Sequence, residues 1–164
     1  AYTPSQKIPD EVYTAVSFTW GFDETDNVTG AYTDLNAASW SWPMMLGGGY
    51  HFMQFEGMFI DSTAATRGFA YHNGTAREIT AVPDTIYHAN HFRVKMSNPS
   101  TFGINSDVNT SIELKMNIAE WFKNTYQWDL NVYGPMLMPN YNAQLRMNEN
   151  GRSVFDFDVI QSAN

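Results

Sequence analysis

The stretch Val12-Tyr13-Thr14-Ala15-Val16-Ser17-Phe18-Thr19-Trp20 alternates along its length, with the larger apolar side chains mostly at even-numbered positions. Because successive side chains of a strand point to opposite faces, this period predicts a half-buried β-strand. The same alternation recurs over Ser111–Asn117, where Ile112, Leu114 and Met116 are expected to face inward. Half-buried strands of this kind favour an antiparallel sheet with one face on a core.

Four further strands are predicted from apolar runs that end at turn residues, over Tyr50–Ile60, Gly68–His72, Tyr87–Met96 and Val154–Ile160. The polar stretch Gly21–Asn36 between the first two strands is predicted to be a long loop.

Two short helices interrupt the strands. Asn117 and Glu120 have the spacing of a capping box, which predicts a short helix carrying Trp121. A second helix is predicted over Tyr141–Asn148, with Asn140 as its N-cap. The predicted fold is a single mainly β domain over residues 1–164, an antiparallel β-sandwich with two short helices.

Composition narrows the classes of partner. The net charge of −8, with no compensating basic cluster, argues against nucleic acid and anionic lipid as partners. No apolar run approaches the roughly 18 residues that a membrane span requires. The chain has no cysteine, which excludes disulfides, zinc–cysteine sites and thiol catalysis. Its low charge and its many Asn, Thr and Tyr residues fit an exported protein, and a start without methionine indicates a processed or an engineered N-terminus.

Histidines are the residues best suited to bind a metal in this chain. His51 and His72 fall on predicted neighbouring strands, and His91 lies three residues after His88 in a later strand. Imidazole is a common ligand for copper, zinc, nickel and iron and needs no thiol partner. These spacings match no linear metal-binding motif, so exposed or hydrogen-bonded histidines explain the same pattern.

Other residues admit functional readings as well. Trp40, Trp42, Tyr50 and Phe52 are compatible with a sugar-stacking platform and equally with a core. The acidic residues of 23–27 are compatible with calcium binding or with a solvated loop. A Gly-x-Ser-x-Gly nucleophile elbow is absent, and no nucleophile, base and orienting group can be named together, so we expect a protein that is not an enzyme.

An ordered set of motifs resembles a known family. It comprises Val16-Ser17-Phe18-Thr19-Trp20-Gly21-Phe22-Asp23, Trp40-Ser41-Trp42, Gly48-Gly49-Tyr50 through Phe55-Glu56-Gly57, Tyr71-His72-Asn73-Gly74, Asn90-His91-Phe92, Asn117-Ile118-Ala119-Glu120-Trp121-Phe122 and Asn148-Glu149-Asn150-Gly151. From about Ile8 to Phe157 the chain resembles the MbnP-like family, periplasmic or surface proteins associated with methanobactin operons and copper uptake.

The resemblance implies copper bound by histidine imidazoles on a β-sandwich. It also implies a tryptophan oxidised to kynurenine as a further ligand, with a dihaem MauG-type enzyme as the modifying partner. His72 is the ligand that the His-x-Gly motif implies, and His51 and His91 are the further candidates. The resemblance does not distinguish among Trp40, Trp42 and Trp121 as the modified residue.

The family pattern usually includes two or three strands before the point where this chain starts. The resemblance therefore implies a domain that lacks its first strands: either the chain is a processed fragment, or a partner chain or a second copy in a homo-oligomer supplies them. Two other functions fit the sequence: a structural or self-assembling surface module of the same fold without a metal site, and a carbohydrate-binding module.

Overall fold

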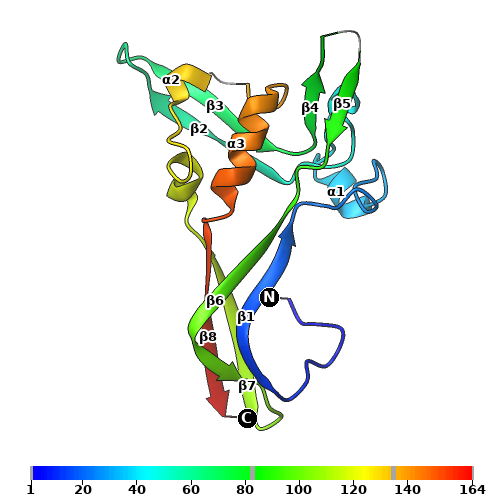
Figure 1. Cartoon of the computed structure of the whole chain (residues 1–164), viewed down its shortest axis with the longest axis vertical. Helices are drawn as coiled ribbons and strands as arrows, with labels where there is room; N and C mark the ends of the chain where they lie inside the picture. The colour runs from blue at the N-terminus through cyan, green and yellow to red at the C-terminus, as the bar shows by residue number, and fades with distance from the viewer. Residues whose placement is uncertain (1, 82–83, 134–135, 164) are drawn as a thin grey trace.

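The computed structural model describes residues 2–81, 84–133 and 136–163. In Figure 1 the lower half of the molecule is made of long strands, and the upper half combines two hairpins with helices. The long strands are β1 (Val12–Trp20), β6 (Phe92–Gly103), β7 (Val108–Met116) and β8 (Phe155–Ala163). The mainly β, antiparallel fold predicted from the sequence is confirmed.

The lower half consists of two antiparallel ribbons. β1 pairs with β6, so that Trp20 lies opposite Phe92, and β7 pairs with β8, so that Met116 lies opposite Phe155. Aromatic rings pack between the ribbons: the ring centroids of Phe18 and Phe155 are 5.0 Å apart in an edge-to-face contact. This packing of one ribbon on the other is consistent with the predicted sandwich.

In β1 the half-buried face of the strand changes partway along its length. Its register with β6 shifts between Tyr13 and Ala15. The half-buried residues are odd-numbered up to this point and even-numbered from Val16 onward. The predicted inward face is therefore correct for Val16, Phe18 and Trp20 but wrong for Val12, which is exposed. An irregularity of this kind changes which face of the strand meets the core.

The upper half contains two hairpins. β2 (Met53–Ile60) pairs with β3 (Thr66–Asn73), and β4 (Ala76–Ile79) pairs with β5 (Thr85–His88). The strand predicted over 87–96 is wrong as one element, because β5 ends at His88 and β6 begins at Phe92. Asn90 is buried in the connection between the two strands.

Both predicted helices are present. Helix α3 (Tyr141–Gly151) is capped by the Asn140 side chain, whose Oδ1 accepts the Ala143 N–H at 3.0 Å. It continues three residues beyond the predicted end at Asn148.

The other predicted helix is a 3₁₀ turn, η2 (Ile118–Phe122), and the predicted capping box is wrong. Asn117 does accept a backbone N–H, from Ala119, but its own N–H donates to Val154 O at 2.8 Å. The Glu120 side chain pairs with Lys123 instead of returning to Asn117.

Four short elements were not predicted: α1 (Thr33–Ala37), which falls at the end of the predicted loop, η1 (Met44–Leu46), the strand β4 and α2 (Leu130–Tyr133). The main core lies where η2, α3 and the inner face of β2–β3 meet the upper ends of the ribbons. It includes Tyr71, Trp121, Leu137 and Met147, all fully buried. This core holds the β2–β3 hairpin in place, and that hairpin carries His72, while His51 lies in the segment that leads into it.

Candidate functional site

The fold brings His51 and His72 together. His51 lies in the segment that leads into β2, and His72 is the second-last residue of β3. The Phe52 N–H donates to Asn73 O at 2.7 Å, which joins these two segments of the chain. The two ring centroids are 5.1 Å apart with the planes at 82°, and the residues are only 7% and 8% exposed.

Hydrogen bonding defines the tautomer of His51. Its Nδ1 lies 3.0 Å from the carbonyl oxygen of Trp40, which can only accept a hydrogen bond. The proton is therefore on Nδ1, and the lone pair is on Nε2. Burial lowers the pKa of the imidazole below its ordinary value, and a charge on His72 acts in the same direction, against the Trp40 carbonyl. The neutral, ligand-competent form of His51 is favoured.

His72 shows the opposite tautomer. Its Nε2 lies 2.9 Å from Oε1 of Glu56, a carboxylate on the same face of the hairpin. An ionised carboxylate accepts, so Nε2 carries the proton and Nδ1 carries the lone pair. That Nδ1 is buried and has no hydrogen-bond partner among the described residues. A buried polar atom without a partner is uncommon and calls for a ligand or water.

Each imidazole thus donates a hydrogen bond through one ring nitrogen, and its second ring nitrogen keeps a lone pair. Metal-binding histidines commonly donate their second ring N–H to a carbonyl or carboxylate in this way. With a nitrogen–metal bond of about 2 Å, two ligating rings have centroids roughly 4.5–6.5 Å apart, a range that includes the observed separation. The described residues contain no group of three or more His, Asp or Glu side chains that could hold a metal. The pair therefore offers two donors.

Trp42 packs directly against this pair. Its ring centroid is 4.8 Å from that of His51 in an edge-to-face contact, and the residue is 1% exposed. The other side of the indole lies on Gly74, where an added Cβ would be 2.6 Å from ring atoms. The indole of Trp42 therefore fills the space that a side chain at position 74 would need. The second tryptophan of the Trp-x-Trp motif, Trp42, and the glycine of the His-x-Gly motif, Gly74, are therefore in contact.

The other two tryptophans considered for modification are placed differently. Trp40 meets His51 through its backbone carbonyl, and Trp121 is in the main core, with its ring 6.1 Å from that of Tyr71. Trp42 is thus the one whose ring contacts a histidine of the pair.

The remaining histidines lie outside the pair. His91 is in the connection between β5 and β6. His88 bonds to Glu78 at 2.7 Å, and its ring lies 5.2 Å from that of Tyr141. In the described part of the chain, the ring contacts of His51 are with Trp42 and His72. The structure therefore brings together two of the three predicted ligands, and His91 is not among them.

The two alternative sites considered from the sequence were a sugar-stacking platform and a calcium-binding loop. Trp42, Tyr50 and Phe52 are buried, so they offer no platform on which a sugar ring could stack. In the acidic loop, Asp23 accepts hydrogen bonds from Thr25 and from the Asp26 N–H. Its carboxylate thus organises a turn of the exposed loop.

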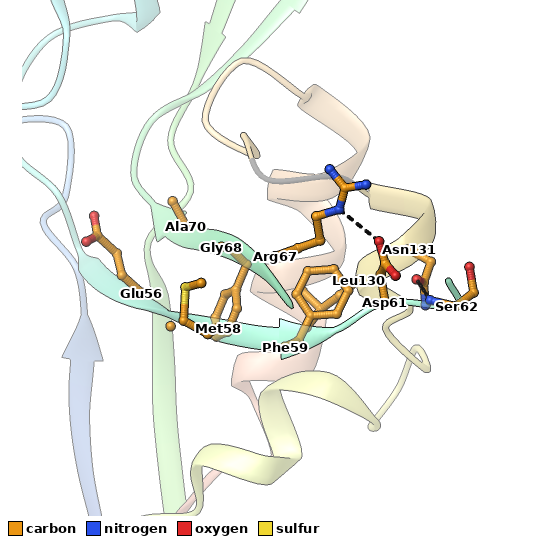
Figure 2. A pocket seen from close by; sticks show the side chains of 12 residues that line it. Glu56, Met58, Phe59, Asp61, Ser62, Arg67, Gly68, Ala70, Leu130 and Asn131 are labelled. Carbon is orange, nitrogen blue, oxygen red and sulfur yellow. Dashed lines mark hydrogen bonds and ion pairs between the residues drawn. The ribbon is translucent and has the colours of Figure 1, made fainter. Parts of the chain in front are cut away.

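A cleft of about 980 Å³ lies at the far end of the same hairpin, next to α2. Figure 2 shows Met58, Phe59 and Leu130 in its wall, with Arg67 paired to Asp61 at 2.8 Å. The cleft therefore combines an apolar wall with an exposed ion pair. Glu56, the partner of His72, lines the cleft at its opposite end.

The residues that hold the pair from behind were not predicted from the sequence. The buried amides of Asn90 and Gln144 bond to the backbone of Gly74, and the buried amides of Asn148 and Asn73 bond to Asn90 and Gln144. Three of these amides lie in motifs that the sequence offered for other roles: Asn73 beside His72, Asn90 beside His91 and Asn148 at the end of the second predicted helix. No local pattern marked these amides as buried, because each of the three asparagines has a histidine or a glutamate beside it in sequence.

Fold and site together describe a mainly antiparallel β domain with a buried pair of histidines beside a tryptophan. The family model of MbnP matches residues 2–139, and the chain belongs to the MbnP family. No curated protein and no solved structure matches it significantly. The matched range contains the histidine pair and Trp42 but ends before α3. None of the helices in the described ranges is long and apolar enough to cross a bilayer.

The lowered pKa of His51 predicts a pH dependence of stability. The unfolded imidazole titrates near its ordinary pKa of about 6.5, whereas burial keeps the folded one neutral to lower pH. Below about pH 6.5 the unfolded state therefore binds more protons, and the free energy of unfolding falls as pH falls through the folded pKa. Urea denaturation of metal-free protein between pH 7 and 5 measures this loss, which should be smaller in His51→Gln. Equal losses in both proteins would contradict the assignment.

Proposed function

We propose that this protein binds copper through Nε2 of His51 and Nδ1 of His72, and that it does so in the periplasm or outside the cell. The observation that carries the proposal is the hydrogen bonding of the pair. A carbonyl holds one ring and a carboxylate the other, and the buried Nδ1 of His72 has no partner among the described residues. Membership of the MbnP family supports copper as the metal and export as the location.

The donor set favours copper over other common metals. Calcium and magnesium prefer six or more oxygen ligands, and structural zinc sites use four protein ligands. Two imidazoles are too few for either arrangement, whereas copper accepts imidazole ligands in sites with three close donors. One more donor would complete such a site. Copper, when bound, would supply a redox-active centre; the proposed role of the protein is binding rather than catalysis.

We assign the third position to Trp42 after its oxidation to kynurenine. The support is its contact with His51, with ring centroids 4.8 Å apart, which neither Trp40 nor Trp121 makes through its ring. The dihaem MauG-type partner that the family resemblance implies would act on this residue. Trp42 is buried against Gly74, so the modified side chain would remain at the pair.

Metal analysis and intact mass of protein purified natively without chelator test this function. We expect one copper per chain, and a mass that shows the loss of one carbon and the gain of one oxygen, mapped to the peptide that contains Trp42. Copper with an unmodified mass would keep the histidine site and remove the kynurenine assignment. Protein that neither carries copper nor binds added Cu(I) would refute the proposal.

A second candidate function is a self-assembling surface module without a metal site. In the described ranges every sheet has two strands, so each strand has one edge that no other strand pairs with. These edges favour self-assembly. An unpaired edge can add a strand from another copy of the chain. Sedimentation velocity of metal-free protein at several concentrations tests this function. Concentration-dependent assembly would support it, and a stable monomer that binds copper would leave the first proposal alone.

A further inference from the structure

Helix α3 contacts the candidate site through one fully buried side chain. Gln144 is 0% exposed, and its Nε2 donates to the carbonyl oxygen of His72 at 2.8 Å and to that of Leu137 at 3.2 Å. Its Oε1 accepts the Gly74 N–H at 3.3 Å. The amide therefore bonds to the backbone at His72 and again at Gly74, two residues later. Both ends of the amide are used, so its orientation is defined.

Two further amides extend this network. Asn90 donates through Nδ2 to Gly74 O at 2.9 Å and lies 3.3 Å from Gln144 Oε1. Asn148, one turn further along α3, donates to Asn90 O at 2.9 Å. All three side chains are buried. Since a buried amide that loses its partners is destabilising, this network resists any displacement of the backbone at His72.

The amide network and the Glu56 carboxylate both hold His72, the first at its backbone and the second at its imidazole. Gln144 holds the His72 backbone from behind, and Glu56 holds its imidazole in front. The free Nδ1 is consequently placed by two hydrogen bonds, one from α3 and one from β2. Because α3 lies outside the range that the family model matches, family membership does not assign it a part in the site.

We infer that Gln144 is a positioning residue for His72, and that the docking of α3 is thermodynamically coupled to metal binding at the histidine pair. The second part rests on the proposed function; the first does not. Coupling between two sites is reciprocal. Docked α3 therefore raises the affinity of the pair for Cu(I), and bound Cu(I) stabilises docked α3.

The chain offers a matched control for this inference. Asn150, on the same helix, is also fully buried; it donates to Trp121 O at 2.8 Å and Tyr126 O at 2.9 Å and accepts the Tyr126 N–H. Gln144→Met and Asn150→Leu each remove a buried amide with two donated bonds to carbonyls. The two losses of stability should be comparable, but only Gln144→Met releases His72.

The first measurement is competition for Cu(I) against a chromophoric chelator, at a temperature where circular dichroism shows all three proteins folded. Removing an outer hydrogen bond around a metal site typically costs about 10–100-fold in affinity, and we expect this loss for Gln144→Met. We expect a change below about 3-fold for Asn150→Leu, because Asn150 bonds to Trp121 and Tyr126 and not to the backbone at His72 or Gly74. Equal losses in both variants would overturn the positioning role.

Two readouts keep the inference testable if Gln144→Met does not fold or the wild type binds no copper. In wild-type protein, added Cu(I) should slow hydrogen exchange of backbone amides within 141–151; unchanged exchange in copper-loaded protein would overturn the coupling. In metal-free protein, the imidazole Nε2–H resonance of His72 should broaden or shift in Gln144→Met and stay unchanged in Asn150→Leu. If wild type binds no Cu(I) while this difference is seen, the proposed function fails and the positioning role stands.

Discussion

Replacing His72 with alanine is expected to lower the affinity of the protein for Cu(I) by more than about 100-fold, beyond the 10–100-fold typical of changes outside the ligand set. The substitution removes the buried Nδ1 lone pair and leaves one imidazole donor at the site. It also leaves the Glu56 side chain, which is mostly exposed, to be solvated at little cost. Competition against a chromophoric Cu(I) chelator measures the change.

Variants of the other histidines provide the comparison. His51→Ala should lose a similar factor, because it removes the second donor of the same pair. His91→Ala and His88→Ala should retain wild-type affinity, since neither ring contacts the pair among the described residues. A His72→Ala protein with undiminished affinity would place the copper site elsewhere. A large loss in His91→Ala alone would favour the third candidate ligand over the arrangement of the pair.

The largest expected change in stability is that of Trp121→Ala, which should lower the free energy of unfolding by about 3–5 kcal/mol. Trp121 is 0% exposed, and its ring lies 5.7 Å from that of Trp20 on β1 and 6.1 Å from that of Tyr71 on β3. It therefore connects the ribbons to the hairpin that carries His72. The truncated side chain would leave a cavity between them. Guanidinium denaturation followed by circular dichroism measures the loss.

Met44→Ala is the matched control, because Met44 is a large apolar residue that remains 71% exposed. A surface substitution of this kind should change the free energy of unfolding by no more than about 0.5 kcal/mol. Similar midpoints for Trp121→Ala and Met44→Ala would show that Trp121 is not part of a well-packed core.

Much of the fold could be predicted from local patterns. The strand Val12–Trp20 has the predicted bounds, and the helix that follows Asn140 begins where its cap indicates. These elements were predictable because period and capping depend on residues near in sequence. The neighbourhood of His51 and His72 was also predictable, because a hairpin places consecutive strands side by side.

Errors arose where distant segments compete for the same atoms. The Asn117 N–H bonds to Val154 O rather than to Glu120, so the capping box does not form. The chain breaks its strand between His88 and Phe92, where the Asn90 side chain bonds to Gly74 and Gln144. His91 was therefore a reasonable candidate from its motif, whereas the residue of that motif that reaches the site is Asn90.

Alternation, capping and a cysteine-free composition with four histidines were enough to indicate a mainly β domain and to make the histidines the candidate ligands, because each depends on residue type and short-range spacing. The tautomers of His51 and His72, the unpartnered Nδ1, the contact with Trp42 and the support from Gln144 all required tertiary structure. The hydrogen bond between Gln144 and His72 spans 72 positions of sequence. Its formation depends on how the helix docks on the hairpin, and local sequence patterns do not encode that geometry.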